Sequence, residues 1–293
     1  MELCIDFGGT EIKLALIDRA RVIASDSIPV RGDASDLAAA ADAARALGSA
    51  GAPTSLGIAV PGVVDPATGR MLHANAKYDF LNDFDLTAWA AAELNLPAIV
   101  ENDARAALVG ETTTGSAAGT RDAVLVTLGT GIGTAAMIDG FPLRGHSGHA
   151  GILGGHVTTD INGPTCPCGN IGCGEALAST WALAQTHRDL AIRDLFVGDV
   201  HAGVRDSFLH VWGATVVTLV HMYDPSVVIL SGGILRAGDA VREPIETYVR
   251  AHVWPSITPP RFVVPPEPEL SVARGLSVLA PRATRSPEDQ EDQ

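Results

Sequence analysis

The stretch Leu3-Cys4-Ile5-Asp6-Phe7-Gly8-Gly9-Thr10-Glu11-Ile12-Lys13 predicts two short apolar strands joined by a turn of small residues. A second stretch, Leu128-Gly129-Thr130-Gly131-Ile132-Gly133, lies between strands expected over 123–128 and 134–138. The two stretches form a weak internal repeat. Hairpin tips without bulky side chains expose backbone N–H groups, so two of them together favour a clamp for a polyphosphate. Either turn alone is equally compatible with an ordinary hairpin.

The chain around these hairpins alternates between strand and helix patterns. Further strands are expected at 22–28, 56–60, 98–101, 227–230 and 262–264. Helices are expected at 35–47, 86–94, 240–252 and 272–280, with another beginning at 104 and a long one closing at 218–223.

The charge, the apolar runs and the cysteine spacing of the chain indicate which kinds of partner and cellular location to expect. The 293 residues carry a net charge of -14 and show no basic stripe, so nucleic acid is an unexpected partner. The N-terminus lacks the pattern of a signal peptide, and no uncharged apolar run reaches the roughly 18–20 residues of a membrane helix. No membrane partner is therefore expected. The cysteines have metal-site spacing instead of a disulfide framework, which predicts a reducing, cytoplasmic location.

The strongest chemical signal is His156-x9-Cys166-x-Cys168-x4-Cys173. Thiolate and imidazole are the ligands that zinc prefers, and four of them make a closed tetrahedral shell. The closed shell predicts a structural Zn²⁺ that leaves no open position for water. The alternative is a set of buried free thiols in a glycine-rich loop.

The segment Val100-Glu101-Asn102-Asp103-Ala104 places an amide and a carboxylate where a strand gives way to a helix. Ligands bind at such strand ends in open α/β sheets, and an Asp there could take a proton from a ligand hydroxyl. Taken alone, the pair is better explained by Asn102 or Asp103 capping the helix that begins at Ala104. Asp6 beside a phosphate clamp suits Mg²⁺. Lys13 could contact a phosphate, but a solvated strand residue is the preferred interpretation.

Together these segments resemble the ROK family of sugar kinases and sugar-responsive regulators, over nearly the whole chain. The matching segments are Asp6-Phe-Gly-Gly-Thr-Glu-Ile-Lys13, Gly57-Ile-Ala-Val-Pro-Gly62, Glu101-Asn-Asp-Ala104, Leu128-Gly-Thr-Gly-Ile-Gly133, and Gly155-His156 through Cys166-Pro-Cys-Gly-Asn-Ile-Gly-Cys173-Gly-Glu175. The cysteine segment is highly specific, whereas the glycine hairpins are shared with a wider superfamily.

The resemblance implies an α/β, two-domain actin-like ATPase (ribonuclease H-like) fold whose interdomain cleft binds a sugar. The N-terminal domain would be 1–103, with a last helix at about 272–281 packing back on it. The C-terminal domain would be 104–271, with the zinc loop at 156–175. The polar tail 285–293 is expected to be disordered.

The resemblance also implies ATP-dependent phosphorylation of a hexose or amino-sugar hydroxyl, with Asp103 as the general base. Residues implied to contact the sugar are Gly62, Asn75, Asn102, Asp103, His156 and Glu175. Residues implied to hold Mg-ATP are Asp6, Gly8, Gly9, Thr10, Thr130 and Gly131, with Gly232 and Gly233 beside the adenosine. Members of the family are often dimers or tetramers, so a homo-oligomer is expected.

One departure bears on the substrate. Family kinases usually carry Glu-x-Gly-His, and Leu153 stands at the Glu position before His156. An aliphatic group cannot accept a sugar hydrogen bond, a loss of order 1.5–3 kcal/mol; His149 is a speculative substitute. A non-catalytic sugar-binding or regulatory protein is therefore the alternative, although the hairpin at Asp6 leads us to expect no DNA-binding module before it. We also expect chelation of zinc to abolish sugar binding before nucleotide binding.

Overall fold

The computed structural model describes residues 1–74 and 76–281, and the chain divides into two compact units. The N-terminal unit comprises Met1–Ala106 and the residues from Val272 onward, and the C-terminal unit comprises Ala107–Ser271. Asn75 and the tail 285–293, for which sugar contact and disorder were expected, lie outside the described residues.

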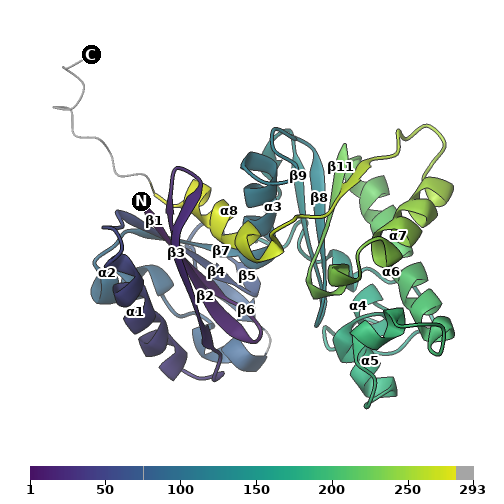
Figure 1. The fold of residues 1–293 in the computed structure, drawn as a ribbon, viewed down its shortest axis with the longest axis horizontal. Helices are drawn as coiled ribbons and strands as arrows, with labels where there is room; N and C mark the ends of the chain where they lie inside the picture. Colours follow the sequence, from purple (N-terminus) through teal and green to yellow (C-terminus); the bar gives the residue numbers. More distant parts are fainter. Residues whose placement is uncertain (75, 282–293) are drawn as a thin grey trace. The chain divides into compact units, whose positions relative to one another are not determined.

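A five-stranded mixed sheet forms the centre of the N-terminal unit, in the order β3-β2-β1-β4-β7 (Figure 1). Its strands are β1 (Glu2–Phe7), β2 (Glu11–Asp18), β3 (Arg21–Pro29), β4 (Ser55–Val60) and β7 (Ala98–Asn102). The β1–β2 and β2–β3 pairs are antiparallel, whereas β4 lies parallel to both β1 and β7. Every residue of β4 is buried, as expected for a parallel strand covered on both faces.

Helices cover both faces of this sheet. On one face lie α1 (Ser35–Gly48) and α2 (Leu86–Leu94), whose apolar side chains join the core around Leu3, Ile5 and Phe7. On the other face, α3 (Asp103–Thr113) contributes Ala106 and α8 (Ser271–Leu279) contributes Leu276. Leu276 lies so close to Gly57 of β4 that a Cβ there would meet the Cβ of Leu276 at 2.7 Å.

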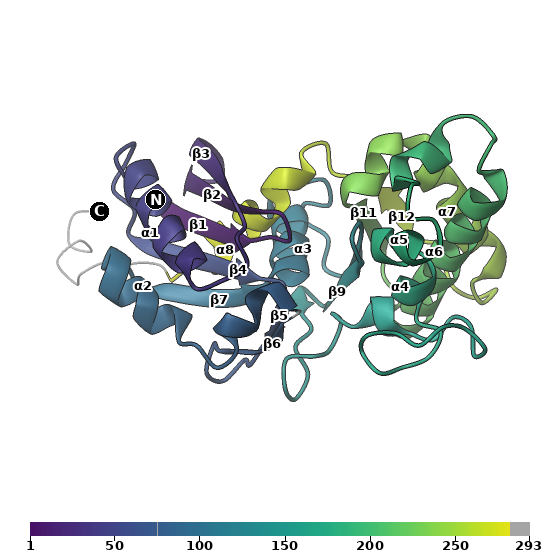
Figure 2. The same ribbon diagram turned by 90° about the horizontal axis from the view of Figure 1, so that it is seen from below.

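The C-terminal unit repeats this arrangement with the order β10-β9-β8-β11-β12. Its strands are β8 (Ala123–Leu128), β9 (Ile132–Ile138), β10 (Phe141–Pro142), β11 (Val227–Ser231) and β12 (Arg261–Val263). The antiparallel and parallel pairs fall in the same places as in the first sheet. Figures 1 and 2 both show α6 (Ala202–Tyr223) and α7 (Asp239–His252) side by side. The α/β class and the internal repeat are thereby confirmed.

Shorter elements complete the two units. They are β5 (Gly62–Val64), β6 (Met71–Ala74), α4 (Gly174–Leu177), α5 (Thr180–Thr186), and the 3₁₀ helices η1 (Ala76–Leu81), η2 (Gly154–His156), η3 (Ile192–Phe196), η4 (Gly233–Ala237) and η5 (Pro268–Leu270). The sequence pattern predicted no helix or strand in these segments.

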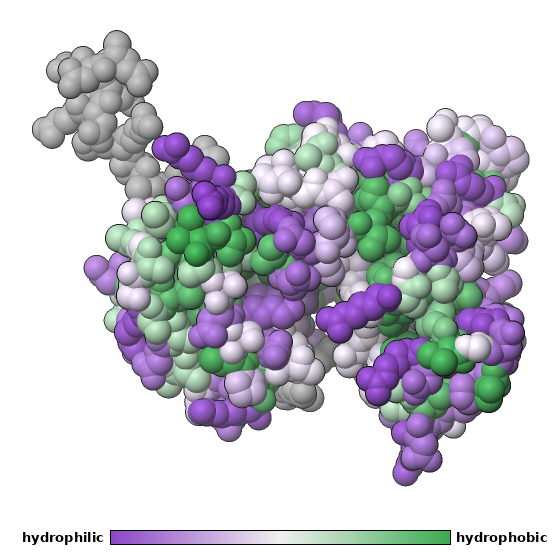
Figure 3. Space-filling view, in the orientation of Figure 1, coloured by the Kyte–Doolittle hydropathy of each residue, from purple (hydrophilic) through white to green (hydrophobic). Residues whose placement is uncertain are grey.

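The surface mixes polar and apolar side chains. On the face drawn in Figure 3, hydrophilic and hydrophobic residues are interspersed over each unit. Phe141 and Trp254, 71% and 68% exposed, are among the large apolar side chains in contact with solvent. No helix within 1–74 or 76–281 is long and apolar enough to cross a membrane.

Candidate active site and metal centre

The first glycine hairpin joins β1 to β2, and a buried aromatic side chain contacts its backbone. The Tyr78 hydroxyl donates to the Gly8 carbonyl at 2.7 Å, and the Tyr78 ring packs edge-on against Phe7 with 5.9 Å between centroids. Tyr78 is fully buried, whereas Gly9 and Thr10 at the tip are exposed. Tyr78 was not predicted as a site residue, because it lies in an irregular segment 70 positions from its partner.

Asp6 is the last acidic group before this tip and sits in a charged neighbourhood. In the β1–β2 ladder it is directly opposite Lys13, so both side chains are on the same face of the sheet. Burial, followed by the nearby charge of Asp103, raises the pKa of Asp6 to about 7, and Lys13 opposes both effects. Lys13 is intermediate in exposure, so its side chain is partly solvated, and its charge also lowers the pKa of Asp6.

At the end of β7, Asn102 fulfils the capping role foreseen as the alternative. Its Oδ1 accepts from the backbone N–H of Arg105 at 3.0 Å. Its Nδ2 donates to the Gly62 carbonyl at 3.2 Å and to Asp103 Oδ1 at 3.0 Å. Asn102 thus contacts the helix start, the neighbouring carboxylate and the Gly62 carbonyl.

The Asp103 carboxylate is fixed at one oxygen. Oδ1 also accepts from the Ala104 N–H at 2.7 Å, so two hydrogen bonds hold this oxygen. Burial raises the pKa of Asp103 to about 6, against the lowering effect of the hydrogen bonds from Ala104 and Asn102. A carboxylate that is oriented, partly buried and shifted toward neutral pH can act as a proton acceptor.

A buried ion pair lies behind this site. Arg105 Nη1 is 2.7 Å from Glu101 Oε1, and the two side chains are 1% and 3% exposed. Glu101 Oε1 also accepts from the Asn102 N–H at 2.8 Å. The pair therefore supports the backbone on both sides of Asn102 and Asp103. Arg105 was not predicted from the sequence, since an arginine in a helix is usually solvated.

The second glycine hairpin joins β8 to β9, and its carbonyl groups are held by α5. The N–H of Thr180 donates to the Gly129 carbonyl at 3.0 Å, and the N–H of Trp181 donates to the Thr130 carbonyl at 3.1 Å. In a trans peptide the C=O and the next N–H point in opposite directions. The N–H groups of Thr130 and Gly131 are consequently directed away from α5, as a phosphate clamp requires.

Glu175 reaches the same hairpin from the zinc loop. Its Oε2 accepts from the Ile132 N–H at 2.8 Å. A Cβ at Gly131 would collide with this carboxylate, so the Glu175 side chain would have to move away from its present position. The structure therefore brings Glu175, implied by resemblance to contact a sugar, against the hairpin implied to hold ATP.

The two glycines expected beside adenosine follow β11. Gly232 has a φ of 97°, and a Cβ there would strike the Leu128 carbonyl, so its identity is explained by backbone geometry. Gly233 begins η4, and a Cβ on it would meet no atom within 4 Å. Of the two, Gly233 leaves space for a ligand.

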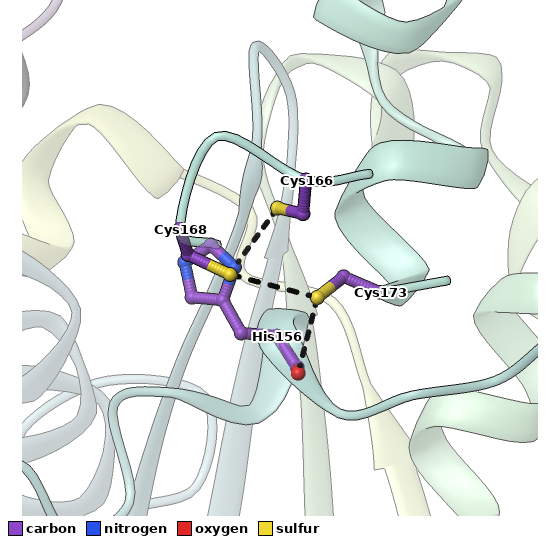
Figure 4. A group of neighbouring side chains, drawn as sticks. All are labelled: His156, Cys166, Cys168 and Cys173. Carbon is purple, nitrogen blue, oxygen red and sulfur yellow. Dashed lines mark hydrogen bonds between the residues drawn. The ribbon is translucent and has the colours of Figure 1, made fainter. Parts of the chain in front are cut away.

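The four predicted metal ligands come together. His156, Cys166, Cys168 and Cys173 place their ligand atoms within 4.8 Å of one another, and Figure 4 shows the side chains pointing toward a common centre. Cys166 Sγ lies 3.6 Å from His156 Nδ1, and Cys168 Sγ lies 3.7 Å from Cys173 Sγ. Cys166 and Cys173 are buried and Cys168 is exposed.

These separations fit a tetrahedral zinc ion. With Zn–S near 2.3 Å and Zn–N near 2.0 Å, tetrahedral angles give edges of about 3.8 Å for S···S and about 3.5 Å for S···N. The observed separations of 3.7 and 3.6 Å agree with these edges. Burial raises the pKa of Cys173 to about 12, so an ion would have to displace a proton there.

Leu153 lies immediately before η2 and is 43% exposed. Its aliphatic side chain is thus presented to solvent three residues from His156. His149, the speculative substitute, is exposed, and its Nδ1 is 3.0 Å from Ser147 Oγ. His149 is therefore engaged by a neighbouring hydroxyl on the surface.

The chain matches the ROK family over residues 2–283. It belongs to the ROK family. A glucokinase from Halalkalibacterium halodurans is 29% identical over 287 residues, 86% of each chain. A xylose repressor from Bacillus spizizenii is 29% identical over 213 residues, 69% of this chain and 54% of the repressor.

Solved structures agree with this assignment. A ROK family glucokinase from Streptomyces griseus, in complex with glucose and AMPPNP, is 25% identical and has a TM-score of 0.82, covering 95% of this chain and 98% of that one. This ROK protein accordingly has the expected two-domain actin-like ATPase fold.

Proposed function

We propose that this ROK protein is a sugar kinase that transfers the γ-phosphoryl group of ATP to a hydroxyl of a hexose or amino sugar. The observation that carries the proposal is Asp103, whose Oδ1 is fixed by Ala104 and Asn102 and whose pKa is raised to about 6. The similarity to glucokinases over most of the chain supports the same reaction.

In this proposal Asp103 is the general base. The sugar hydroxyl gives its proton to Asp103 Oδ2 while the hydroxyl oxygen attacks the γ-phosphorus. The new P–O bond forms while the bond to the β,γ-bridging oxygen breaks, which releases ADP. Asn102 orients both the carboxylate and the sugar, so the chemistry is mainly positioning.

Each glycine hairpin is proposed to contribute groups that bind the ATP phosphates. The first offers the open tip at Gly9 and Thr10, and the second offers the N–H groups of Thr130 and Gly131. Gly8 is held by Tyr78, and Gly233 would border the adenosine. When bound, Mg²⁺ would neutralise phosphate charge, and we propose that Asp6 serves it, directly or through water.

The zinc is proposed to be structural. His156, Cys166, Cys168 and Cys173 would fill its shell, which leaves no site for a reacting water. The ion would fix η2 and the start of α4, and so the positions of His156 and Glu175. From the resemblance we also propose that His156, Glu175 and Asn75 contact the sugar and that the protein forms a homo-oligomer. The metal-site spacing of the cysteines supports the proposal of a cytoplasmic location.

The test is ATP consumption with a panel of hexoses and amino sugars, comparing the wild-type protein with Asp103→Asn. Asparagine keeps the hydrogen-bonding shape but cannot take the proton, so turnover should fall by about 10²–10⁴-fold. Asp42→Asn is the matched control, since Asp42 is 79% exposed on α1 and should leave turnover unchanged. Equal turnover by wild type and Asp103→Asn would refute the assignment of Asp103 as the general base.

The exposed Leu153 favours a second candidate, a non-catalytic sugar-binding ROK protein. Calorimetry separates the two candidates. Sugar binding without any binding of Mg-ATP would support the second, whereas binding of both ligands supports the kinase.

A further inference from the structure

We propose that Glu175 is a positioning residue of the second glycine hairpin, which it sets for the phosphates of ATP, in addition to any contact with the sugar. The inference rests on the proposed kinase function and deepens it. The Glu175 carboxylate accepts the Ile132 N–H at 2.8 Å across 43 residues of sequence.

The backbone hydrogen bonds of this turn support the assignment. The Gly129 N–H donates to the Gly131 carbonyl at 3.0 Å, and α5 holds the carbonyls of Gly129 and Thr130. Glu175 takes the Ile132 N–H. Among the described residues, the turn N–H groups left without a protein acceptor are those of Thr130 and Gly131. Unpaired backbone donors that are fixed in direction are the groups a phosphate needs.

The Glu175 carboxylate determines in two ways which N–H groups of the turn stay available to a phosphate. It gives the Ile132 N–H a protein acceptor, so that this peptide does not turn toward the nucleotide. It also occupies the space beside Gly131, where a Cβ would collide with Oε2. The hairpin is therefore held in one conformation before ATP binds, which lowers the entropic cost of binding.

The zinc loop is built against the same residue. Cys173 is the N-cap of α4, and Glu175 lies in the first turn of that helix. A Cβ at Gly155, next to the ligand His156, would strike the Ile132 carbonyl. Both segments that carry metal ligands thus pack on the tip of the hairpin, so order in the zinc loop is transmitted to the phosphate site. Chelation should then weaken nucleotide binding as well as sugar binding, unlike the order expected from the sequence.

Calorimetric titration with Mg-AMPPNP in the absence of sugar tests the proposal. Glu175→Gln keeps an oxygen that can accept from Ile132, whereas Glu175→Ala does not. We expect Glu175→Gln to bind AMPPNP at least as tightly as wild type, because a negative charge near the phosphates is removed. We expect Glu175→Ala to bind about tenfold more weakly than Glu175→Gln. Glu243→Ala, at an exposed position of α7, is the control and should match wild type.

A second pair of variants keeps the test independent of general destabilisation. Gly131→Ala should weaken AMPPNP binding strongly in the wild-type background and much less in the Glu175→Ala background, where the colliding carboxylate is gone.

Equal AMPPNP affinity of Glu175→Gln and Glu175→Ala, or an equal effect of Gly131→Ala in both backgrounds, would overturn the inference. If the wild-type protein binds no AMPPNP, the proposed kinase function itself is contradicted. The two failures are therefore distinguishable.

Discussion

Replacing Arg105 with methionine tests the buried support of the proposed base. The substitution keeps most of the side-chain volume but removes the cation that lies 2.7 Å from Glu101 Oε1. Both side chains are at most 3% exposed, so water cannot take the place of the lost partner. Breaking one side of such a buried pair costs about 3–5 kcal/mol.

Urea unfolding followed by circular dichroism at pH 7.5 measures this cost. Arg45→Met is the matched control, because Arg45 pairs with Asp42 and Glu93 at positions that are about half exposed or more. An exposed pair contributes less than about 1 kcal/mol. If Arg105→Met costs no more free energy of unfolding than Arg45→Met, the buried pair does not support the end of β7. If Arg105→Met costs more free energy of unfolding than Arg45→Met, turnover should also fall, because Asn102 and Asp103 lose the support of the buried ion pair.

The remaining predictions concern protonation, metal and specificity. kcat/KM should fall as pH drops below about 6, where Asp103 becomes protonated, and a flat profile from pH 8 to 5 would contradict this. Asp6 holds its proton up to about pH 7 when folded but ionises near pH 4 when unfolded, so folding stability falls as pH rises between these values. Asp6→Asn should therefore raise the free energy of unfolding in urea at pH 7.5, by on the order of 2 kcal/mol, while abolishing turnover; an unchanged free energy would count against it. Stripping the metal should lower AMPPNP affinity measured after Mg²⁺ is restored, and unchanged affinity would uncouple the zinc loop from the hairpin. Leu153→Glu should lower the sugar KM, since it adds an acceptor for a hydroxyl, and an unchanged or higher KM would place Leu153 away from the sugar.

The sequence predicted features whose signal is local. The small residues at Gly8–Thr10 and Gly129–Gly133 marked both hairpins, and their flanking apolar runs became the β1–β2 and β8–β9 pairs. The cysteine spacing identified a ligand cluster because the chain between Cys166 and Cys173 is too short to separate them. The same locality explains why Asn102 was foreseen as a helix cap.

Contacts between distant positions could not be predicted in this way. No pattern links Tyr78 to Gly8 or Glu175 to Ile132, which are 70 and 43 positions apart. Lys13 was expected to be solvated because a single lysine on a strand usually is, and only the register of β1 and β2 places it opposite Asp6. The candidate site residues therefore lie in short motifs that the sequence shows, whereas the side chains that support them are brought close by tertiary packing.

Phosphorus NMR of the reaction mixture tests the central proposal most directly. Wild-type protein, Mg-ATP and the best sugar of the panel should produce a sugar phosphomonoester signal in amounts equal to the ADP formed, and Asp103→Asn should produce neither. Formation of ADP with inorganic phosphate alone, or no ADP with any sugar, would contradict the assignment of this ROK protein as a sugar kinase that uses Asp103 as its base.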